Sequence, residues 1–360
     1  NRIRCLAAFQ NPEFYRKQNL RLSTALTPRI ISCAKEFPDY IAIPRGCRDY
    51  LVSLLDRIGV ILEIDDHRQT GTEIDVSFRG ELDPAQKEAA AELLNHDTGI
   101  FIAPPGSGKT IVAIYMAAMR RRNTLVIVHR KPLLDQWRAQ LAMFLGIPLK
   151  ETGTIYSGRK KPNGKIDVAM MQSLTAGGAV KDMVAGYGNV IVDECHHLPA
   201  VSFERVLSTV KARYITGLTA TPQRRDGHQP ITLMQLGPIR FRMKPAGNAA
   251  NMSFKHRLIV RETNFQISAS GTDQPGIQEI YAKMIDDDSR NRMICDDVRE
   301  EISQGRFPLL LTERKAHLDV LSEMLADIPD HLIVLKGGMN SSFYRNALEK
   351  LKSVPSGESR

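Results

Sequence analysis

The stretch Gly99-Ile-Phe-Ile-Ala-Pro-Pro-Gly-Ser-Gly-Lys-Thr-Ile-Val-Ala-Ile114 runs from an apolar strand through a glycine-rich turn into a helix. In such a turn, successive backbone N–H groups and the positive end of the helix dipole face one concavity, which suits phosphate oxygens. Gly106 and Gly108 let the backbone approach a ligand closely. The sequence therefore predicts an α/β fold that carries a nucleoside triphosphate cradle.

Each residue of this turn has an expected part in binding ATP. Lys109 would reach the β- and γ-phosphates as a point charge, and the Thr110 hydroxyl suits a Mg²⁺ ligand. Ala103 stands where the usual pattern has Gly, a tolerable change because this residue leaves the strand and need not contact phosphate. An ordinary strand, turn and helix is the alternative for a match taken alone. The phosphates would lie against Pro104, Pro105, Gly106, Ser107 and Gly108.

An acidic pair follows a second apolar run, in Asn189-Val-Ile-Val-Asp-Glu-Cys-His196. Asp193 would hold Mg²⁺, usually through a water molecule, and Glu194 would orient and deprotonate the water that attacks the γ-phosphate. A solvated strand end is the alternative for the pair alone, but its order and spacing after the glycine-rich turn favour a hydrolytic site. Cys195 invites a zinc interpretation, which is rejected because no second Cys or His pair lies at ligand spacing.

The composition is typical of a large intracellular protein with a polyanionic partner. The chain has 360 residues, enough for two or three domains, and a formal net charge of +9. Its five cysteines show no pairing pattern, and the sequence has no signal peptide or bilayer-length apolar run, so we expect a soluble cytoplasmic protein. Because it begins with Asn1 and stops after a helix-like segment, we expect a piece of a longer polypeptide. Basic residues gather in Arg120–Arg122, expected only to solvate a helix end, and in His129–Lys131, Arg159–Lys161 and Arg224-Arg225.

Three regions follow one another along the chain. Residues 1–80 predict a small α+β module, residues 81–250 the nucleotide-binding domain, and residues 258–360 a further alternation of strand and helix. In the first region we expect strands at Ile41–Ile43, Ile61–Ile64 and Ile74–Phe78, a helix at Tyr50–Ile58 and a hairpin turn at Asp65–Thr72. In the third we expect strands at Phe307–Leu311 and His331–Leu335 around a helix at Ala316–Ile328.

Five apolar runs in the middle region predict a parallel sheet. Each run is followed by a polar loop, and ligands of open α/β sheets bind at the loops after the carboxyl ends of the strands. We therefore expect all five loops to line one edge of the sheet. The runs are Gly99–Ala103, Thr124–Val128, Asp167–Met171, Asn189–Val192 and Tyr214–Leu218.

In this order the loops resemble the motifs of superfamily 2 DNA helicases and translocases of the DEAD/DEAH type. Ala103–Thr110 resembles motif I, Leu125–Trp137 motif Ia, Asp193–His196 motif II and Thr219-Ala-Thr221 motif III. The resemblance implies a RecA-like P-loop NTPase domain that uses ATP and Mg²⁺, followed by a partial second RecA-like domain after residue 258. It implies that Gln86, in Leu82-Asp-Pro-Ala-Gln86, reads the adenine edge.

The resemblance also implies residues for coupling and for DNA. By this resemblance, His196, Thr219 and Thr221 would couple the state of the γ-phosphate to movement along DNA. Contacts to the nucleic acid, with DNA more likely than RNA by resemblance only, are expected mainly at phosphates and with little sequence preference. For the residues after the third-region strand, a simple strand end and turn fit equally well. The expected DNA contacts are Arg130, Lys131, Gln172, Ser173, Thr312 and Arg314.

Within the superfamily, Thr221–Gly227 and the module in front most resemble the branch of XPB-type helicases and restriction-enzyme motor subunits, and more narrowly the helicase portion of TOTE conflict-system proteins. Residues 1–80 would then be a DNA-recognition-like domain. The family's Gln-x-x-Gly-Arg-x-x-Arg run does not occur in this sequence, so this chain is expected to bind ATP but to hydrolyse it poorly. Two alternatives stay open, namely a defence-system motor that translocates duplex DNA without unwinding it, and a DNA-binding module switched by ATP.

Overall fold

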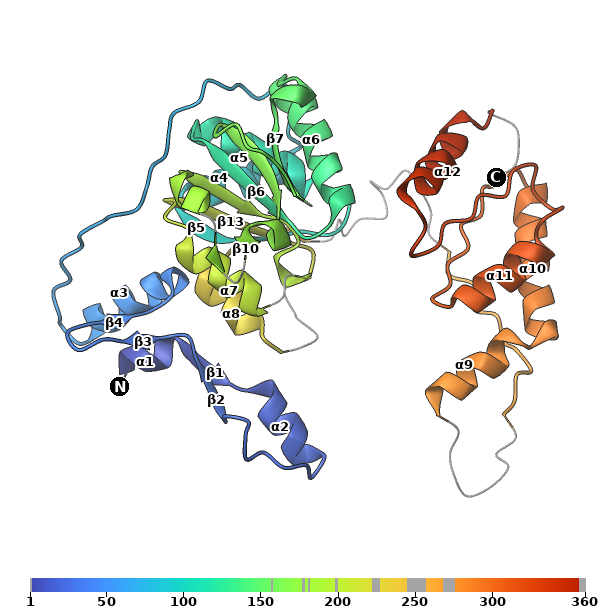
Figure 1. Cartoon of the computed structure of the whole chain (residues 1–360), viewed down its shortest axis with the longest axis horizontal. Coiled ribbons are helices and arrows are strands. Elements are labelled where there is room, and N and C mark those ends of the chain that lie inside the picture. Colours follow the sequence, from blue (N-terminus) through green and yellow to red (C-terminus); the bar gives the residue numbers. More distant parts are fainter. Residues whose placement is uncertain are drawn as a thin grey trace. The chain divides into compact units, whose positions relative to one another are not determined.

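The protein is described by a computed structural model that covers residues 2–156, 158–176, 179–180, 182–197, 200–221, 227–244, 257–267 and 276–355. The chain divides into two compact units, Asn1–Ser253 and Phe254–Arg360 (Figure 1). Every helix within the described ranges is too short or too polar to cross a lipid bilayer. The boundary expected at residue 80 lies inside the first unit and stays a prediction.

An eight-stranded sheet forms the centre of the first unit (Figure 1). Its strand order is β14-β5-β13-β12-β6-β9-β7-β8, and neighbouring strands are parallel except for β7 and β8. In the central register, Val190 lies opposite both Leu125 and Ile215. The strands are β5 (Thr98–Ile102), β6 (Thr124–Val128), β7 (Gly153–Tyr156), β8 (Arg159–Lys161), β9 (Ile166–Met170), β12 (Asn189–Val192), β13 (Tyr214–Thr219) and β14 (Ile239–Arg242).

The five strands expected from the sequence are all present and parallel, which confirms the α/β fold class. Their near-continuous apolar runs arise because both faces of the sheet are covered. Along β5, Ile100 and Ile102 point into one core while Phe101 points into the other. Three short strands towards the two edges of the sheet, β7, β8 and β14, were not expected, because their sequences mix polar and charged residues with few apolar ones.

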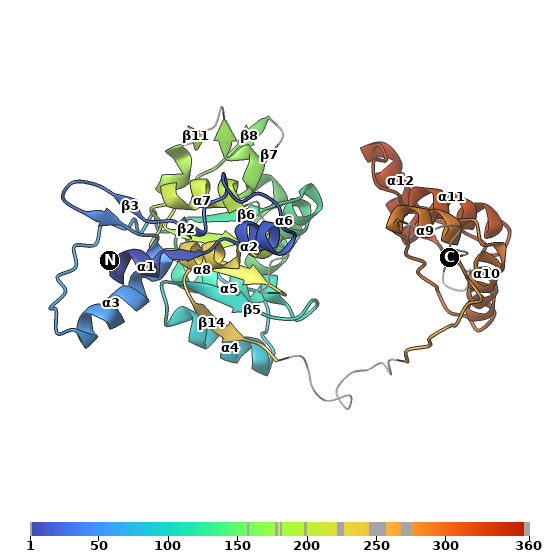
Figure 2. The same cartoon turned by 90° about the horizontal axis from the view of Figure 1, so that it is seen from below.

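Helices cover both faces of the sheet, as in a doubly wound fold. On one face, buried residues of α4, α5 and α6 form a core with Phe101, Val126 and Val168. On the other, α7 and α8 pack against Ile100 and Leu125 (Figure 2). The helices are α4 (Pro84–Leu94), α5 (Lys109–Arg120), α6 (Lys131–Leu145), α7 (Ala200–Thr209) and α8 (Gln229–Leu236). Shorter elements are η2 (Leu149–Glu151), η3 (Met171–Ser173), η4 (Asp182–Gly186), η5 (Cys195–His197), β10 (Thr175–Ala176) and β11 (Ala179–Val180).

Arg120 corrects one expectation about the basic clusters. It was expected, with its two neighbours, only to solvate the end of α5. Its guanidinium instead donates to Asn189 Oδ1 and Thr216 Oγ1, both at 3.1 Å, and to the His96 carbonyl oxygen at 3.0 Å. Arg120 therefore ties the helix to the amino ends of three strands, because a guanidinium carries enough donors for all of these oxygens.

The first eighty residues add to the first unit without a large core of their own. The expected helix is present as α3 (Arg48–Arg57). The strands expected at 61–64 and 74–78 are not assigned, although Glu73, just before the second, forms an isolated bridge with Arg122, and residues 65–72 form no hairpin. These strands do not form because a short apolar run becomes a strand only where a neighbouring strand pairs with its backbone N–H and C=O groups. The other elements are α1 (Arg2–Leu6), β1 (Ala8–Gln10), α2 (Pro12–Asn19), β2 (Ile30–Ser32), β3 (Lys35–Glu36), β4 (Ile41–Ala42) and η1 (Arg45–Cys47).

This N-terminal segment is anchored through a few buried residues. Ala7, Cys33 and Cys47 belong to the same core as α7 and α8. Gly46 packs so tightly on α8 that a Cβ there would lie 2.3 Å from the Leu233 carbonyl oxygen. The α3 region is therefore fixed against the central sheet and its helices by close backbone contact and not only by surface charges.

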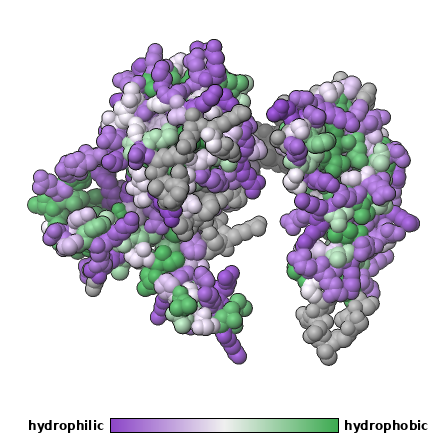
Figure 3. Space-filling view, in the orientation of Figure 1, coloured by the Kyte–Doolittle hydropathy of each residue, from purple (hydrophilic) through white to green (hydrophobic). Residues whose placement is uncertain are grey.

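The second unit is helical in its described part. Its helices are α9 (Ile277–Ile285), α10 (Asp288–Ser303), α11 (Lys315–Met324) and α12 (Ser341–Ser353), and α11 confirms the helix expected near Ala316. The strands expected at 307–311 and 331–335 are wrong, since neither segment is assigned as strand. Both segments are apolar and line one hollow. Hydrophobic residues gather on the surface of the second unit (Figure 3). Leu309 and Leu311 are strongly exposed. The apolar pattern of the two segments was correct, but hydropathy alone does not report backbone pairing.

Candidate functional site

The glycine-rich turn lies between the end of β5 and the start of α5. Gly106 and Gly108 have left-handed backbone angles, with φ of +77° and +80°, and a Cβ at Gly108 would lie 2.3 Å from Gln86 Nε2. Ser107 closes the turn, since its hydroxyl and its N–H both donate to the Pro104 carbonyl oxygen, at 2.7 and 3.3 Å. Because the first N–H groups of a helix have no partner within it, this end of α5 offers donors to an anion.

Neutral backbone atoms hold two side chains against the turn. Lys109 Nζ donates to the carbonyl oxygens of Ala103 at 3.1 Å and Pro104 at 3.4 Å, which are weaker acceptors than a phosphate. The Gln86 side chain is buried, accepts from the Asp83 N–H at 3.1 Å and donates to the Ser107 carbonyl oxygen at 3.1 Å. Gln86 therefore braces the turn, while its expected contact with adenine stays a prediction.

The acidic pair stands directly after β12. Asp193 is buried, and its Oδ2 accepts a hydrogen bond of 2.8 Å from Trp137 Nε1 on α6. Burial raises the pKa of the Asp193 carboxyl, although Trp137, the Glu194 N–H and the nearby Lys109 charge act in the opposite direction. The Lys109 charge and the Asp193 carboxylate are thus close enough to interact, so the two halves of the expected site meet.

Glu194 begins a chain of contacts towards β13. Its backbone is in the left-handed region, with φ of +45°, a strained conformation for a residue with a side chain. Glu194 Oε2 lies 3.3 Å from His196 Nδ1, and the same nitrogen lies 2.7 Å from Thr219 Oγ1. The Thr219 hydroxyl donates to the Thr221 carbonyl oxygen at 2.7 Å. These contacts connect Glu194 to the loop after β13, while the expected coupling role of His196, Thr219 and Thr221 stays a prediction.

The loops after β6 and β9 meet at the same edge of the sheet. Gln172 Nε2 donates to the His129 carbonyl oxygen at 3.4 Å, which joins the two loops. Arg130 is exposed at the start of α6. Lys131 Nζ lies 2.6 Å from Asp135 Oδ2 and over the Tyr156 ring at 4.5 Å. The expectation that the polar loops line one edge is confirmed for these residues, and their contact with nucleic acid stays a prediction.

The chemistry of this edge fits a magnesium-bound triphosphate. A cation beside Asp193 would offset the cost of burying its carboxylate. Lys109 and the N–H groups at the start of α5 would replace their present neutral partners, or water, by phosphate oxygens. Thr110 stands in the first turn of α5, next to Lys109, where a hydroxyl suits the same cation.

Comparison with known families agrees with this geometry. The family described as the type III restriction enzyme res subunit matches residues 79–224, which contain the glycine-rich turn, the acidic pair and the Thr219–Thr221 loop. The segment is thus similar to this restriction-enzyme family and to proteins named as XPB-type helicases and translocases.

Several relatives of the chain carry helicase names. A putative ATP-dependent RNA helicase of Acanthamoeba polyphaga mimivirus is 28% identical over 295 residues, which are 77% of this chain and 55% of that protein. The DNA 3'-5' helicase XPB of Kineococcus radiotolerans is 32% identical over 166 residues, 44% of this chain and 29% of that protein. The chain thus spans about half, or less, of the length of these relatives.

The fold of the chain also occurs among solved structures. The UvsW helicase from bacteriophage T4 aligns with a TM-score of 0.51 over 66% of this chain and 91% of that chain. The sequence identity is only 16%, so the likeness concerns the fold alone.

The remaining expected contacts lie in the second unit, beside Gln172, or outside the described residues. In the second unit, Thr312 Oγ1 lies 3.2 Å from His317 Nδ1, and the Arg314 guanidinium lies 4.5 Å from the centre of the Tyr281 ring. Both residues stand before α11, near the helix start. Ser173 ends η3 beside Gln172. The Arg224-Arg225 cluster, and most of the Thr221–Gly227 segment, lie outside the described residues.

Sequence reasoning missed the contact between Trp137 and Asp193. Trp137 is buried, with 1% of its surface exposed. Its indole N–H also donates to the expected magnesium ligand, 56 positions away in sequence. The only signal was that a buried tryptophan usually needs an acceptor for its N–H, which does not say which residue supplies it.

Proposed function

We propose that this chain is the ATP-dependent motor of a DNA helicase or translocase. The observation that carries the proposal is that Lys109, at the start of α5, and Asp193, directly after β12, stand at the same carboxyl edge of the sheet. Glu194 is linked there through His196 to Thr219. A phosphate-binding lysine, a buried carboxylate for Mg²⁺ and a second carboxylate for the attacking water are the parts that ATP hydrolysis requires. The helicase names of the relatives support this function.

The chain's own residues would divide the work as follows. ATP with Mg²⁺ supplies the reactive phosphoryl group and a positive charge next to it. Lys109 and the turn from Pro104 to Gly108 hold and orient the phosphates, while Asp193 and Thr110 hold the cation. Glu194 accepts a proton from the attacking water, and Gln86 contacts the adenine edge.

Coupling to movement would begin at Glu194. The chain of contacts through His196 and Thr219 supports the transmission of its position to the Thr221 loop. The nucleic acid would lie at Arg130, Lys131, Gln172 and Ser173, with Thr312 and Arg314 of the second unit as further contacts. Because these groups meet phosphates, binding would depend strongly on salt and weakly on sequence. The names of the relatives include both DNA and RNA helicases.

Slow hydrolysis by this chain is part of the proposal. Arginines that reach the transferring phosphoryl group typically contribute about 10³–10⁵ in rate. The Gln-x-x-Gly-Arg-x-x-Arg run that carries them in the family does not occur in this sequence. We therefore expect ATP binding with slow turnover.

The proposal is tested by measuring ATP binding and single-turnover ATP hydrolysis, with and without DNA, for the wild type and Glu194→Gln. The substitution should leave ATP binding intact and lower the hydrolysis rate by about 10²–10⁴, because it removes the proton acceptor. Glu88→Gln, at an exposed carboxylate on α4, is the matched control and should change neither value. Equal rates for Glu194→Gln and Glu88→Gln would refute the assigned site. A wild-type turnover of about 1 s⁻¹ or more would refute slow hydrolysis.

The match to a restriction-enzyme subunit favours a second candidate, a motor that moves along duplex DNA without separating its strands. A strand-displacement assay combined with a triplex-displacement assay distinguishes the two. Triplex displacement without strand separation supports the duplex translocator. If DNA affinity changed with ATP but Glu194→Gln had no biological effect, the chain would instead be an ATP-switched DNA-binding module. The narrower resemblance to TOTE conflict-system proteins stays a prediction.

A further inference from the structure

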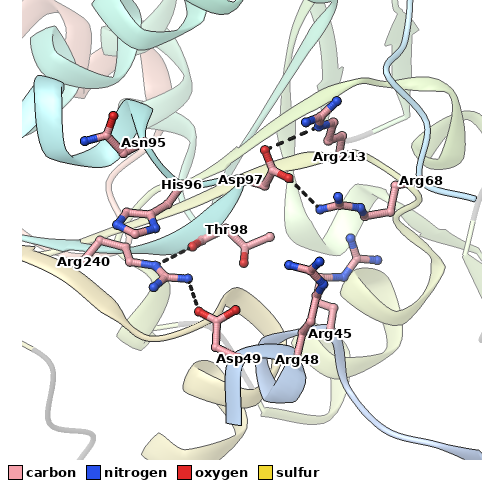
Figure 4. Close-up of a pocket in the computed structure, with 10 residues that line it drawn as sticks. All are labelled: Arg45, Arg48, Asp49, Arg68, Asn95, His96, Asp97, Thr98, Arg213 and Arg240. Carbon is pink, nitrogen blue, oxygen red and sulfur yellow. Dashed lines mark hydrogen bonds and ion pairs between the residues drawn. The ribbon is translucent and has the colours of Figure 1, made fainter. Parts of the chain in front are cut away.

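A second charged pocket lies at the opposite edge of the sheet from the ATP site. The ATP-binding turn follows the carboxyl end of β5, whereas this pocket is lined by Thr98 at the amino end of the same strand. Its volume is about 500 Å³, which is in the range of small-molecule sites. We name it the arginine pocket, because five arginines and only two carboxylates line it: Arg45, Arg48, Arg68, Arg213 and Arg240, with Asp49 and Asp97 (Figure 4).

The arginine pocket is built from segments far apart in the sequence. Arg45 and Arg48 come from η1 and α3, while Arg240 comes from the edge strand β14. Arg240 joins the two sides, since it forms an ion pair with Asp49 and donates to the Thr98 carbonyl oxygen at 2.9 Å. The walls are therefore fixed in the absence of a ligand.

The positive charge of the pocket exceeds what its carboxylates neutralise. Asp97 forms ion pairs with two arginines: its Oδ2 lies 3.0 Å from Arg68 Nη1, and its Oδ1 lies 3.4 Å from Arg213 Nε. Arg68 also pairs with Asp66, which does not line the pocket. Arg45 donates to the carbonyl oxygens of Val210 and Ala212, which carry no net charge. Within the described part of the chain, at least two guanidinium groups, those of Arg45 and Arg48, thus have no carboxylate partner.

The arrangement places these charges together. Figure 4 shows the guanidinium groups of Arg45, Arg48 and Arg68 gathered on one side of the pocket. Burial, and secondarily the charge of Arg68, lower the pKa of Arg45 to about 10. Arg48 is exposed, and the described contacts give its side chain no hydrogen bond or ion pair. If these arginines only attached the N-terminal segment to the sheet, their positive charges would not need to lie close together, because their mutual repulsion opposes that attachment.

We propose that the arginine pocket binds a phosphate-bearing anion at a site separate from the ATP site. Guanidinium groups suit phosphate because their planar fork donates two parallel hydrogen bonds to its oxygens. Arg48 is the principal free donor, and Arg45 and Arg68 add charge beside it. The phosphate could belong to a small molecule such as a nucleotide or to a nucleic-acid backbone, and both present the same chemistry to these residues.

The test compares Arg48→Gln with Arg57→Gln, a matched control at an exposed arginine of the same helix that does not line the pocket. Both substitutions are made in a Lys109→Ala background, which weakens phosphate binding at the ATP site. One arm titrates inorganic pyrophosphate by calorimetry. The other measures the fluorescence anisotropy of a labelled DNA duplex. Circular dichroism and thermal unfolding verify that each variant folds.

We expect Arg48→Gln to weaken binding in at least one arm by about tenfold, as for the loss of one charge-assisted hydrogen bond, while Arg57→Gln has no effect. Arg48→Glu should weaken it further, and Arg48→Lys should restore part of it. Loss in the pyrophosphate arm identifies a small-molecule site, and loss in the duplex arm alone identifies a backbone site. Unchanged binding in both arms, or equal loss in Arg57→Gln, overturns the proposal.

Discussion

The two edges of the central sheet hold their charged residues in different ways. At the carboxyl edge, the Lys109 ammonium donates hydrogen bonds to neutral carbonyl oxygens, and burial raises the pKa of the Asp193 carboxyl. At the amino edge, Arg213 and Arg240 already have carboxylate partners. The carboxyl edge therefore keeps its charges available for a ligand at some cost in stability, whereas most charges of the amino edge help to hold the fold together.

This comparison predicts that single substitutions at the amino edge lower stability more than those at the carboxyl edge. The largest effect is expected for Arg120→Met, which keeps much of the side chain's length but removes the donors to Asn189, Thr216 and the His96 carbonyl. We expect the free energy of unfolding to fall by roughly 3 kcal/mol, because several oxygens lose a charged donor in a partly buried place. Urea unfolding followed by circular dichroism measures this change.

The control for that measurement is Arg122→Met, two positions later, whose side chain makes no described hydrogen bond or ion pair. Its unfolding free energy should stay within about 0.5 kcal/mol of the wild type. If both variants lost the same stability, the loss would come from the helix end in general, and the amino edge would have no special part in holding the fold.

The same contrast explains how much could be predicted from the sequence. The carboxyl edge was predicted well, because Gly106 to Thr110 and Asp193-Glu194 are contiguous motifs whose positions follow from parallel strand order. The arginine pocket was not predicted, because its residues are spread from Arg45 to Arg240 and no local pattern connects them. Residues that form a contiguous motif could therefore be predicted from the sequence. Residues that are distant in sequence and meet only in the folded sheet could not.

The errors in the second unit have a different cause. The apolar runs at 307–311 and 331–335 were expected to be strands, but the structure assigns none there. Alternating or continuous apolar residues report burial, whereas a strand also needs a neighbour that pairs with its backbone N–H and C=O groups. In the first unit that requirement was met by five mutually adjacent runs, so the same type of pattern gave correct strands.

A smaller effect on stability is expected at Trp137, which packs in the core and also contacts the expected Mg²⁺ ligand Asp193. Trp137→Phe keeps an aromatic ring in the core but removes the N–H that donates to Asp193 Oδ2 at 2.8 Å. We expect a loss of roughly 1–2 kcal/mol in the free energy of unfolding, because a buried carboxylate loses one of its donors. ATP hydrolysis should fall as well, since Asp193 would no longer be held in one orientation.

A double-mutant cycle with Asp193→Asn separates the hydrogen bond from the packing of the ring. If the bond carries the effect, the two substitutions should be coupled by about 1 kcal/mol in unfolding free energy. Strict additivity would mean that Trp137 acts only through packing, and that the carboxyl edge does not depend on α6 for the position of its carboxylate.

The smallest effect on stability is expected for a substitution at Lys131. The same substitution tests whether the carboxyl edge of the sheet contacts nucleic acid. Its ammonium pairs with Asp135 and lies over the Tyr156 ring, both at the surface, so Lys131→Gln should change the unfolding free energy by less than about 0.5 kcal/mol. If Lys131 contacts a phosphate, the slope of log K against log salt for duplex binding should become shallower by about 0.9, because one fewer counterion is released. Lys150→Gln, at an exposed lysine in η2, should leave the slope unchanged. Equal slopes for Lys131→Gln and the wild type would remove Lys131 from the interface and leave Arg130 as the basic residue to test at the start of α6.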